Sequence, residues 1–253
     1  MRRTIAVVNQ KGGVGKTTTA ANLAAGLALA EHPTLLVDLD PQGNATTGLG
    51  IQKTGLYPTV YHVLLGAEAL EKALRPAGPP FLRVLPSDID LVGAEIELVG
   101  IEHRESRLKA ALESIELDGW IIIDCPPSLG LLTINALVAA DSVLVPLQCE
   151  FYALEGLTHL LKTVKLVRER LNSRLRVGGI VLTMFDGRTS MALQIRDEVH
   201  RYFPGEIYET VIPRNVRLSE APSHGKPVML HDLRSSGAVA YLELTREVLK
   251  HEQ

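Results

Sequence analysis

The feature of this sequence that most limits its possible folds is the glycine-rich stretch Lys11–Thr18, which reads KGGVGKTT. An apolar run from Thr4 to Val8 precedes it, and an Ala- and Leu-rich segment with helical spacing follows it. This order matches the phosphate-binding loop pattern G-x-x-x-x-G-K-[ST], in a variant form with Gln10 at the first glycine position. Strand, loop and helix in this order favour a fold in which strands and helices alternate.

The loop has the chemistry of a polyphosphate site. Its glycines let successive backbone N–H groups turn toward one point, where side chains would otherwise block a polyphosphate. The helix that begins near Lys16 adds the positive end of its dipole there. Lys16 supplies a cation for the β- and γ-phosphates, and the Thr17 hydroxyl is placed to ligate Mg²⁺. The predicted nucleotide contacts in the loop are Lys11, Gly12, Gly13, Val14, Gly15, Lys16, Thr17 and Thr18.

Length and charge limit the class of protein further. The chain has 253 residues, 46% of them hydrophobic, and no linker-like stretch, so we expect a single domain over residues 1–253. A formal net charge of −3 excludes a globally basic nucleic-acid binder. The halves differ, however: residues 1–150 carry 11 Lys and Arg against 17 Asp and Glu (−6), and residues 151–253 carry 15 against 12 (+3). This asymmetry permits a basic face on the C-terminal half.

Cysteine usage and hydropathy predict a soluble, cytoplasmic protein. Cys125 and Cys149 have neither metal-ligand spacing nor the pattern of a disulfide framework, which indicates reduced thiols. The apolar run behind Met1 is too short for a signal peptide. No apolar stretch approaches the ~18 residues that a membrane-spanning helix needs.

Apolar runs alternate with amphipathic segments along the whole chain. We predict strands over Thr4–Asn9, Thr34–Val37, Leu82–Leu85, Trp120–Asp124, Ser142–Pro146, Val177–Met184 and Ile207–Val211. We predict helices over Lys16–Ala30, Val60–Leu65, Glu68–Leu74, Asp88–Leu98, Glu105–Ile115, Thr133–Ala140, Leu154–Leu171, Met191–Tyr202 and Ala238–Lys250, with residues 45–80 otherwise irregular. The alternation predicts an α/β protein with a mostly parallel twisted sheet that helices cover on both faces.

Carboxylates follow two of the expected strands, where ligands sit in open α/β sheets. Asp124 ends the run Trp120–Asp124 and has the position of the Walker B acid, which holds Mg²⁺ directly or through water. Asp38 and Asp40 follow the second strand. One of them is expected to support the magnesium shell while the other faces the γ-phosphate and orients a water. The alternative is that either forms the turn before Pro41.

Four motifs in order resemble one known family. They are Lys11–Thr18, residues 38–44 (DLDPQGN), residues 124–129 (DCPPSL) and residues 213–223 (PRNVRLSEAPS). Together they resemble the deviant Walker A ATPases of the ParA/MinD superfamily of P-loop NTPases. The last two motifs resemble the chromosomal ParA proteins, often called Soj, which partner ParB in DNA segregation.

The resemblance implies roles for particular residues. Lys11 is the signature lysine, which reaches across a dimer interface to the partner's phosphates and stabilises charge there as an arginine finger does. The implied catalytic residues are Lys11, Lys16 and Asp40, and Asp40 positions the attacking water. Asp38 matches an acid near the magnesium. The implied metal shell is Thr17, Asp38 and Asp124, and the implied adenine contacts are Pro213, Asn215 and Met184.

The family also implies DNA binding by an ATP-dependent homodimer, on the nucleoid and without a membrane. Arg188 sits where the family places a DNA-contacting arginine, and Arg217 is a second candidate. Lys162, Lys165 and Arg168 recur on one face of a predicted helix, although an ordinary solvated face gives the same pattern. Non-specific binding to duplex DNA needs several phosphate contacts, and a dimer doubles their number. A ParB-like protein would stimulate the slow ATPase.

Three other functions fit parts of the sequence. A MinD-like membrane-associated cell-division ATPase would need a basic, bulky C-terminal amphipathic helix. Residues 241–253 carry Arg246 and Lys250 against Glu243, Glu247 and Glu252, and an apolar stripe that suits core packing. Iron–sulfur relatives would need cysteines in other settings. A metabolic kinase or ligase would bind an acceptor near Asp40, which the spacing alone leaves open.

Overall fold

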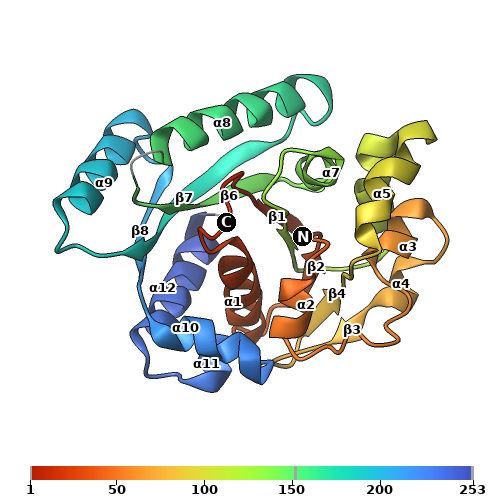
Figure 1. The fold of residues 1–253 in the computed structure, drawn as a ribbon, viewed down its shortest axis with the longest axis horizontal. Coiled ribbons are helices and arrows are strands. Elements are labelled where there is room, and N and C mark those ends of the chain that lie inside the picture. Colours follow the sequence, from red (N-terminus) through yellow and green to blue (C-terminus); the bar gives the residue numbers. More distant parts are fainter. Residues whose placement is uncertain (1, 151–152, 252–253) are drawn as a thin grey trace.

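One twisted sheet organises the chain in the computed structural model, which describes residues 2–150 and 153–251 (Figure 1). The sheet has eight strands in the order β3-β4-β2-β5-β1-β6-β7-β8. The strands are β1 Arg3–Val7, β2 Thr34–Asp38, β3 Arg75–Pro76, β4 Leu82–Leu85, β5 Trp120–Asp124, β6 Ser142–Gln148, β7 Arg176–Phe185 and β8 Ile207–Pro213. All pair in parallel except β3, which runs antiparallel to β4 at one edge.

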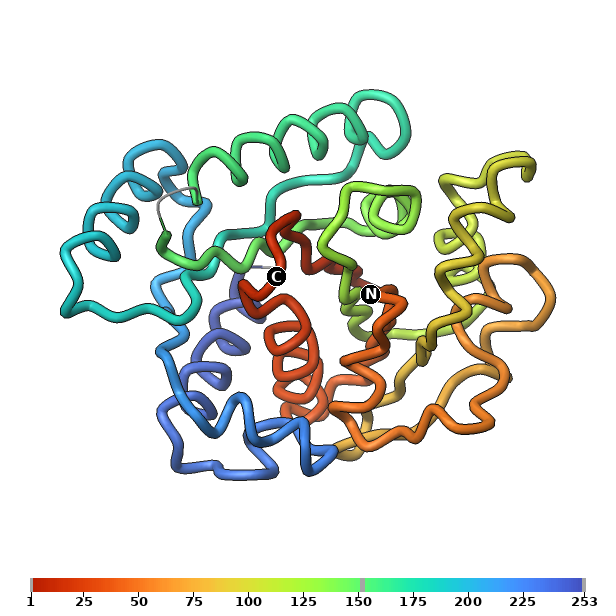
Figure 2. Tube along the Cα trace, viewed as in Figure 1, coloured from red at the N-terminus to blue at the C-terminus, as the bar shows by residue number. Residues whose placement is uncertain are grey.

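Helices cover both faces of this sheet. The helices are α1 Lys16–Leu29, α2 Asn44–Gly48, α3 Val60–Leu65, α4 Leu70–Ala73, α5 Leu91–Glu97, α6 Arg107–Glu113, α7 Leu131–Ala139, α8 Ala153–Arg170, α9 Ser190–Tyr202, α10 Val216–Glu220, α11 Val228–His231 and α12 Ser236–His251. Short 3₁₀ turns span Leu98–Gly100, Arg104–Ser106 and Ala221–His224. Figure 2 shows α1 beside α12, although they lie at opposite ends of the sequence.

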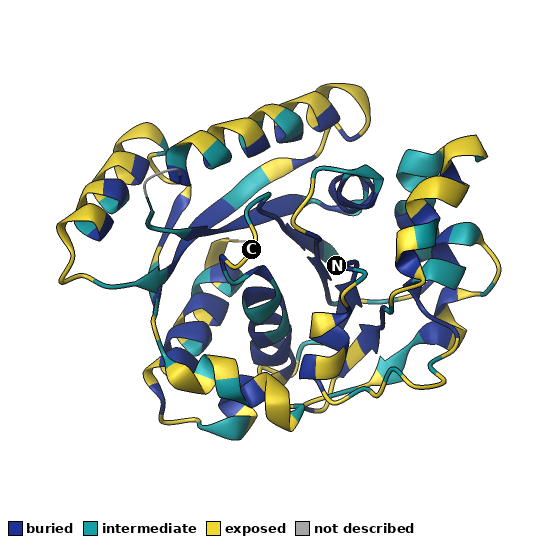
Figure 3. Cartoon of the chain, in the orientation of Figure 1, coloured by how far each residue is buried: buried dark blue, intermediate teal, exposed yellow. Residues whose placement is uncertain are grey.

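The two faces carry separate apolar clusters. On β5, Ile121 and Ile123 pack with α3 to α9, whereas Ile122 packs with α1, α2, α11 and α12. Alternate residues of a strand point to opposite faces, so a continuous apolar run serves both clusters. Figure 3 shows the central strands buried between helices whose outer sides are exposed. The Ile run thus fixes β5 at the centre of the sheet.

The predicted fold class is confirmed, with differences at several boundaries. The antiparallel β3 and the helix α2, within the stretch expected to be irregular, were not predicted. The helix expected over Asp88–Leu98 begins only at Leu91. The last strand was expected to end at Val211, but it continues to Pro213 and so reaches the candidate site.

The C-terminal helix packs as predicted. Tyr241, Leu244 and Val248 of α12 are buried against the sheet. Glu252, part of the charge count for this segment, lies outside the described residues. Across residues 2–150 and 153–251, none of the helices combines the length and the apolar character that spanning a bilayer requires.

Candidate nucleotide site

The glycine-rich loop joins β1 to α1 at the carboxyl edge of the sheet. Gly13 and Gly15 have φ angles of 76° and 88°, a region that favours glycine over side-chain-bearing residues. Two side chains from other elements fix the loop. The Thr183 hydroxyl donates to the carbonyl of Val14 at 2.8 Å, and the Asn9 amide donates to a carbonyl of β6 at 2.8 Å. The first helical residue after Gly15 is Lys16, as expected of a phosphate loop.

Lys16 lies in this loop as a buried cation. Its side chain is folded back so that Nζ donates to the carbonyl of Lys11 at 2.9 Å, and the residue is 7% exposed. Burial lowers the pKa of Lys16, while the nearby Asp124 and Asp40 act in the opposite direction. A buried ammonium within reach of the loop amides is a ready partner for an anion that enters the loop.

Asp38 and Asp124 lie directly side by side, because β2 and β5 pair in register at their last residues. Burial raises the pKa of Asp38 to about 6 and that of Asp124 well above its usual range, the latter helped by the charge of Asp38. Both carboxylate oxygens of Asp124 are buried, and neither forms a hydrogen bond of good geometry with a residue that the structure describes, although the Thr17 hydroxyl lies close enough to lower the pKa of Asp124. Two adjacent buried carboxylates of this kind have the chemistry to hold a cation.

Asp38 differs from Asp124 in that its carboxylate has partners. The hydroxyl and the backbone N–H of Thr46 donate to Asp38 Oδ2 at 2.7 and 2.8 Å, and the N–H of Asp40 donates to Oδ1 at 3.2 Å. Thr46 also accepts from the N–H of Ser87 at 2.9 Å, which ties α2 to the end of β4. Sequence reasoning missed Thr46, because a threonine in an expected loop carries no signal of its partner.

Asp40 lies at the mouth of the same cluster. It is 8% exposed, and its Oδ1 accepts from the N–H of Gln42 at 2.9 Å. This contact closes a turn before the Gly43 segment, so the expected turn-forming role is real. Its second oxygen leaves Asp40 capable of accepting a further hydrogen bond near the phosphate loop.

Lys11 points away from Lys16, toward the surface. Its Nζ forms an ion pair with Glu150, which follows β6, and the two side chains are 41% and 44% exposed. The pair ties the loop to the segment before α8. Glu150 was not predicted, since a lone acid after a strand has many ordinary uses.

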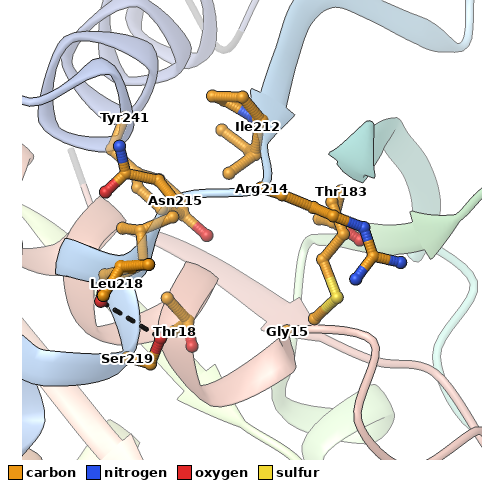
Figure 4. Close-up of a pocket in the computed structure, with 12 residues that line it drawn as sticks. Gly15, Thr18, Thr183, Ile212, Arg214, Asn215, Leu218, Ser219 and Tyr241 are labelled. Atoms are coloured by element: carbon orange, nitrogen blue, oxygen red, sulfur yellow. Dashed lines mark hydrogen bonds between the residues drawn. The ribbon is translucent and has the colours of Figure 1, made fainter. Parts of the chain in front are cut away.

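A cavity of about 370 Å³ opens beside the loop, toward β7, β8 and α10 (Figure 4). The three predicted adenine contacts, Met184, Pro213 and Asn215, all line it, together with Gly15 and Thr18 of the loop region. Sequence reasoning missed further lining residues that come from three different elements: Ile212, Arg214, Leu218 and Tyr241. The cavity is continuous with the phosphate loop and mixes apolar walls with polar groups, as nucleobase pockets do.

Two of these wall residues have constrained geometry. Met184 has a φ angle of 49°, which is uncommon for a residue with a side chain and turns the chain at the cavity rim. Asn215 caps α10, since its Oδ1 accepts from the N–H of Arg217 at 2.9 Å and its amide donates to Ser236 at 2.8 Å. The cavity wall is therefore held in place by local hydrogen bonds.

The predicted DNA-contacting arginines lie outside this cluster. Arg188 is in the loop after β7, with a side chain that is 90% exposed and doubly hydrogen-bonded to Asp186 at 2.8 and 2.7 Å. Arg217 on α10 contacts Glu220 at 2.7 Å and Asp232 at 3.3 Å. Each arginine is thus paired with an acid of its own chain.

The donors of the carboxylate pair fit magnesium better than a softer metal. Within the described residues no group of three or more His, Cys, Asp and Glu side chains forms a metal site. Two carboxylates and a threonine hydroxyl suit Mg²⁺, which keeps several waters and shares phosphate oxygens. Both cysteines are free thiols; Cys125 is buried, and burial raises the pKa of Cys149 to about 11.

The chain is similar to known proteins over most or all of its length. A protein family described as an AAA domain matches residues 2–177. The chain is 56% identical over 249 residues to the sporulation initiation inhibitor protein Soj of Bacillus subtilis (strain 168), covering 98% of each chain. It is 55% identical over 251 residues to the chromosome partitioning protein ParA of Myxococcus xanthus (strain DK1622), covering 99% of this chain and 89% of that protein. A solved structure of cobyrinic acid a,c-diamide synthase from Mycobacterium smegmatis with bound ADP and magnesium has a TM-score of 0.88 at 39% identity, covering 100% of this chain and 96% of that one.

Proposed function

The chain belongs to the ParA and Soj family of chromosome-partitioning ATPases, and from that premise we propose that it is an ATP-driven switch for DNA segregation. ATP and Mg²⁺ bind at Lys11–Thr18 and join two copies of the chain. The pair binds duplex DNA of the nucleoid without sequence preference. A ParB-like protein then stimulates hydrolysis, and the DNA is released.

The observation that carries the proposal is the buried charge at the end of β2 and β5. A buried carboxylate such as Asp124, whose oxygens form no hydrogen bond of good geometry within the described residues, destabilises an empty protein, and a bound cation would offset that cost. Asp124 and Asp38 would hold Mg²⁺ with the Thr17 hydroxyl, and Lys16 would leave the Lys11 carbonyl for the β- and γ-phosphates. Mg²⁺, when bound, neutralises phosphate charge and orients the phosphate oxygens.

Hydrolysis needs a positioned water and a cation for the charge that develops on the transferred group. Asp40 is the side chain we assign to the water, since it lies near Lys16 and has an oxygen to spare beyond its bond to Gln42. The Lys11 side chain is 41% exposed and, among the described residues, is held by its ion pair with Glu150, so it could move to the phosphates of a second subunit. A partner lysine would complete the site only in the dimer, which couples hydrolysis to pairing.

The adenine end is supplied by the cavity beside the loop. Met184 and Pro213 offer apolar surface to a base, and the polar groups of Arg214 and Asn215 stand at its edge (Figure 4). The solved relative with bound ADP and magnesium supports a bound nucleotide in this chain.

DNA binding is assigned to the dimer because one copy presents few basic groups. Arg188 and Arg217 are the proposed phosphate contacts, and both must share or leave their acid partners to bind DNA. Two copies double the number of contacts on one surface, and the affinity for a polyanion rises steeply with that number. ATP would therefore control DNA binding by controlling pairing.

The variant Asp40→Ala tests the proposal. We expect ATP binding to be retained and turnover to fall roughly 100-fold or more, as when a positioning base is lost. The variant should then remain as an ATP-bound pair on plain duplex DNA, measured by light scattering and by retention with ADP, ATP or no nucleotide. The exposed Asp197→Ala serves as a matched control. A variant that stays single when saturated with ATP, or that binds DNA equally well when empty, would contradict the switch.

The similar diamide synthase raises a second candidate, an ATP-dependent ligase that activates a small acceptor. Its 39% identity is lower than the 56% shared with Soj. The two functions differ in what ATP turnover requires. Stimulation by duplex DNA together with a ParB-like protein supports the switch, whereas stimulation by a small carboxylic acid supports the ligase. A MinD-like membrane role is not favoured, since the apolar stripe of α12 is buried.

A further inference from the structure

An apolar stripe on α5 and the turns around it faces solvent. Ile89, Val92, Ile96 and Val99 are 63%, 51%, 75% and 62% exposed. Their spacing of three, four and three residues places them on one side of the helix, while Leu91, Ala94 and Leu98 occupy the opposite, buried side. A helix of this kind has two apolar faces, and the cluster that includes α3 covers only one of them. Surface stripes of this type mark interaction sites.

The stripe is bordered by acids. Residues 84–103 contain five Asp and Glu and no Lys or Arg. Four of the acids are exposed: Asp90, Glu95, Glu97 and Glu102. The next basic residue, Arg104, pairs with Glu105 at 3.0 Å. The stripe is therefore apolar at its centre and negative at its border, and one basic residue, Lys53, lies in the adjoining groove.

The stripe continues into a groove that reaches the candidate site. A groove of about 500 Å³ runs between Pro41 and Gln42 on one side and Asp88–Asp90 on the other, and Lys53, whose Nζ donates to the carbonyl of Gln42, also lines it. One oxygen of Asp88 is buried there and accepts no hydrogen bond from any residue that the structure describes. Gln42 is the residue whose N–H contacts Asp40. A partner in the groove would thus touch the turn that holds the proposed water-positioning carboxylate.

The negative charge around the stripe favours one kind of binding partner over the others. A second copy on the two-fold axis of a symmetric pair would set the same stripe against itself, and its acids against acids. An anionic membrane surface would meet the same repulsion. A helix with apolar residues on one face and Lys or Arg beside them matches both the stripe and its border.

We propose that the stripe of α5 and the adjoining groove dock a basic amphipathic helix of the protein that stimulates hydrolysis. This proposal rests on the proposed function, since it names the surface through which the ParB-like partner acts. The apolar side of the partner helix covers Val92, Ile96 and Val99. A basic side chain enters the groove toward Asp88 and moves the Pro41–Gln42 turn, and with it Asp40.

Binding is tested first with a probe that needs no natural partner. The probe is a fluorescent peptide of roughly five helical turns, with Leu and Ile at heptad spacing and Lys beside them. A second peptide carries Glu in place of each Lys. We expect the basic peptide to bind the full chain, salt to weaken it, and Ile96→Glu to weaken it roughly tenfold or more, as for a central interface residue. Val239→Glu, at an exposed apolar site of α12, is the matched control and should bind like wild type.

Activity separates this proposal from the proposed function. With the ParB-like protein of the same genome, Ile96→Glu should keep ATP binding, ATP-dependent pairing and basal turnover but lose stimulation. Normal stimulation of Ile96→Glu overturns the docking surface and leaves the switch standing. Suppose that the basic peptide binds wild type, that Ile96→Glu weakens this binding, and that no ParB-like protein stimulates wild-type ATP turnover. That result supports the docking surface and overturns the switch. Equal binding of both peptides, loss of ATP-dependent pairing in Ile96→Glu, or Ile96-dependent binding to anionic vesicles each overturns the proposal in favour of another occupant.

Discussion

The charges of this molecule fall into two groups that differ in burial. At the phosphate end, defined by Lys16, Asp38 and Asp124, the residues are 7%, 0% and 0% exposed. At the surface, the side chains of Arg188 and Arg217 are 90% and 52% exposed. The first group brings two carboxylates and one lysine close together, and the oxygens of Asp124 form no hydrogen bond of good geometry within the described residues. In the second group every arginine has an acid partner.

Burial determines how much a single residue of each group can do. Charges in a poorly polarisable interior interact strongly, and water does not replace a lost partner. Exposed ion pairs contribute only about 0–1 kcal/mol each, because solvent screens them. The phosphate end should therefore respond sharply to single substitutions, and the arginine surface only modestly. Five substitutions, from the largest expected effect to the smallest, test this contrast.

The substitution Lys16→Ala should have the largest effect. It removes the buried cation that we assign to the β- and γ-phosphates, so ATP affinity should fall roughly 100-fold or more, which corresponds to ~2.7 kcal/mol or more. Titration calorimetry with Mg²⁺-ATP measures it. Lys72→Ala, which removes an exposed lysine paired with Glu68, is the control and should bind normally. Equal ATP affinities of Lys16→Ala and Lys72→Ala would show that the buried lysine contributes no more to ATP binding than the exposed one.

Asp124→Asn should change how stability depends on pH. The folded-state pKa values of Asp38, at about 6, and Asp124 lie above their unfolded values. Their protonated forms favour the folded state, so this contribution is complete below about pH 4 and is lost as the pH rises through the folded-state pKa of each group, which is about 6 for Asp38 and well above the usual range for Asp124. Asn does not ionise. Without nucleotide and metal, the variant should therefore be more stable than wild type at pH 8 by ~1–3 kcal/mol, and the difference should shrink toward pH 4.

Denaturant unfolding across this pH range measures the effect, with the exposed Asp197→Asn as control. Magnesium and ATP should stabilise the wild type at pH 8 but not Asp124→Asn, because the cation has lost a ligand. A variant that is less stable than wild type at every pH would show that the carboxylate pair is satisfied within the chain.

The fold could be predicted where local pattern and tertiary environment agree. Trp120–Asp124 was predicted to the residue, since a run that is buried on both faces is apolar throughout. The strand β3 was missed because two residues, one of them Pro76, carry no period and pair only at an edge. The start of α5 was predicted too early because Asp88 and Ile89 continue its helical spacing while forming a turn.

The residues of the candidate site were predicted or missed for the same reason. The phosphate loop and the acids Asp38 and Asp124 are found from spacing, and parallel pairing brings them together. Thr46 and Glu150 were not found, because their roles depend on which strands become neighbours. The acid partners of Arg188 and Arg217 lie within about one helical turn or in a following loop, but sequence does not show that they are engaged.

Arg188→Ala and its opposite, Asp186→Asn, test the surface group. Arg188 holds the pKa of Asp186 down at about 2, so this acid is charged at neutral pH and competes with DNA phosphates for the arginine. Arg188→Ala should weaken ATP-dependent binding to plain duplex about three- to tenfold and reduce the salt slope by about one per subunit, whereas Asp186→Asn should strengthen binding. A filter-binding salt series measures both. Arg196→Ala, which removes a different exposed ion pair, is the control. Unchanged retention in both variants would place the basic surface elsewhere.

Glu150→Gln should have the smallest effect, because Lys11 belongs to the phosphate loop by sequence but to the exposed group by environment. Its ion pair with Glu150 holds it away from the loop, and both side chains are about two-fifths exposed. Breaking an exposed pair changes an equilibrium by about 1 kcal/mol at most, or about fivefold. Because the pair competes only with transfer of Lys11 to the partner's phosphates, Glu150→Gln should tighten ATP-dependent pairing by no more than that factor and leave ATP affinity of the single chain unchanged.

Analytical ultracentrifugation over a range of protein concentrations measures the strength of pairing, with Glu155→Gln as control. Weaker pairing in Glu150→Gln would mean that Glu150 acts within the dimer and does not restrain Lys11.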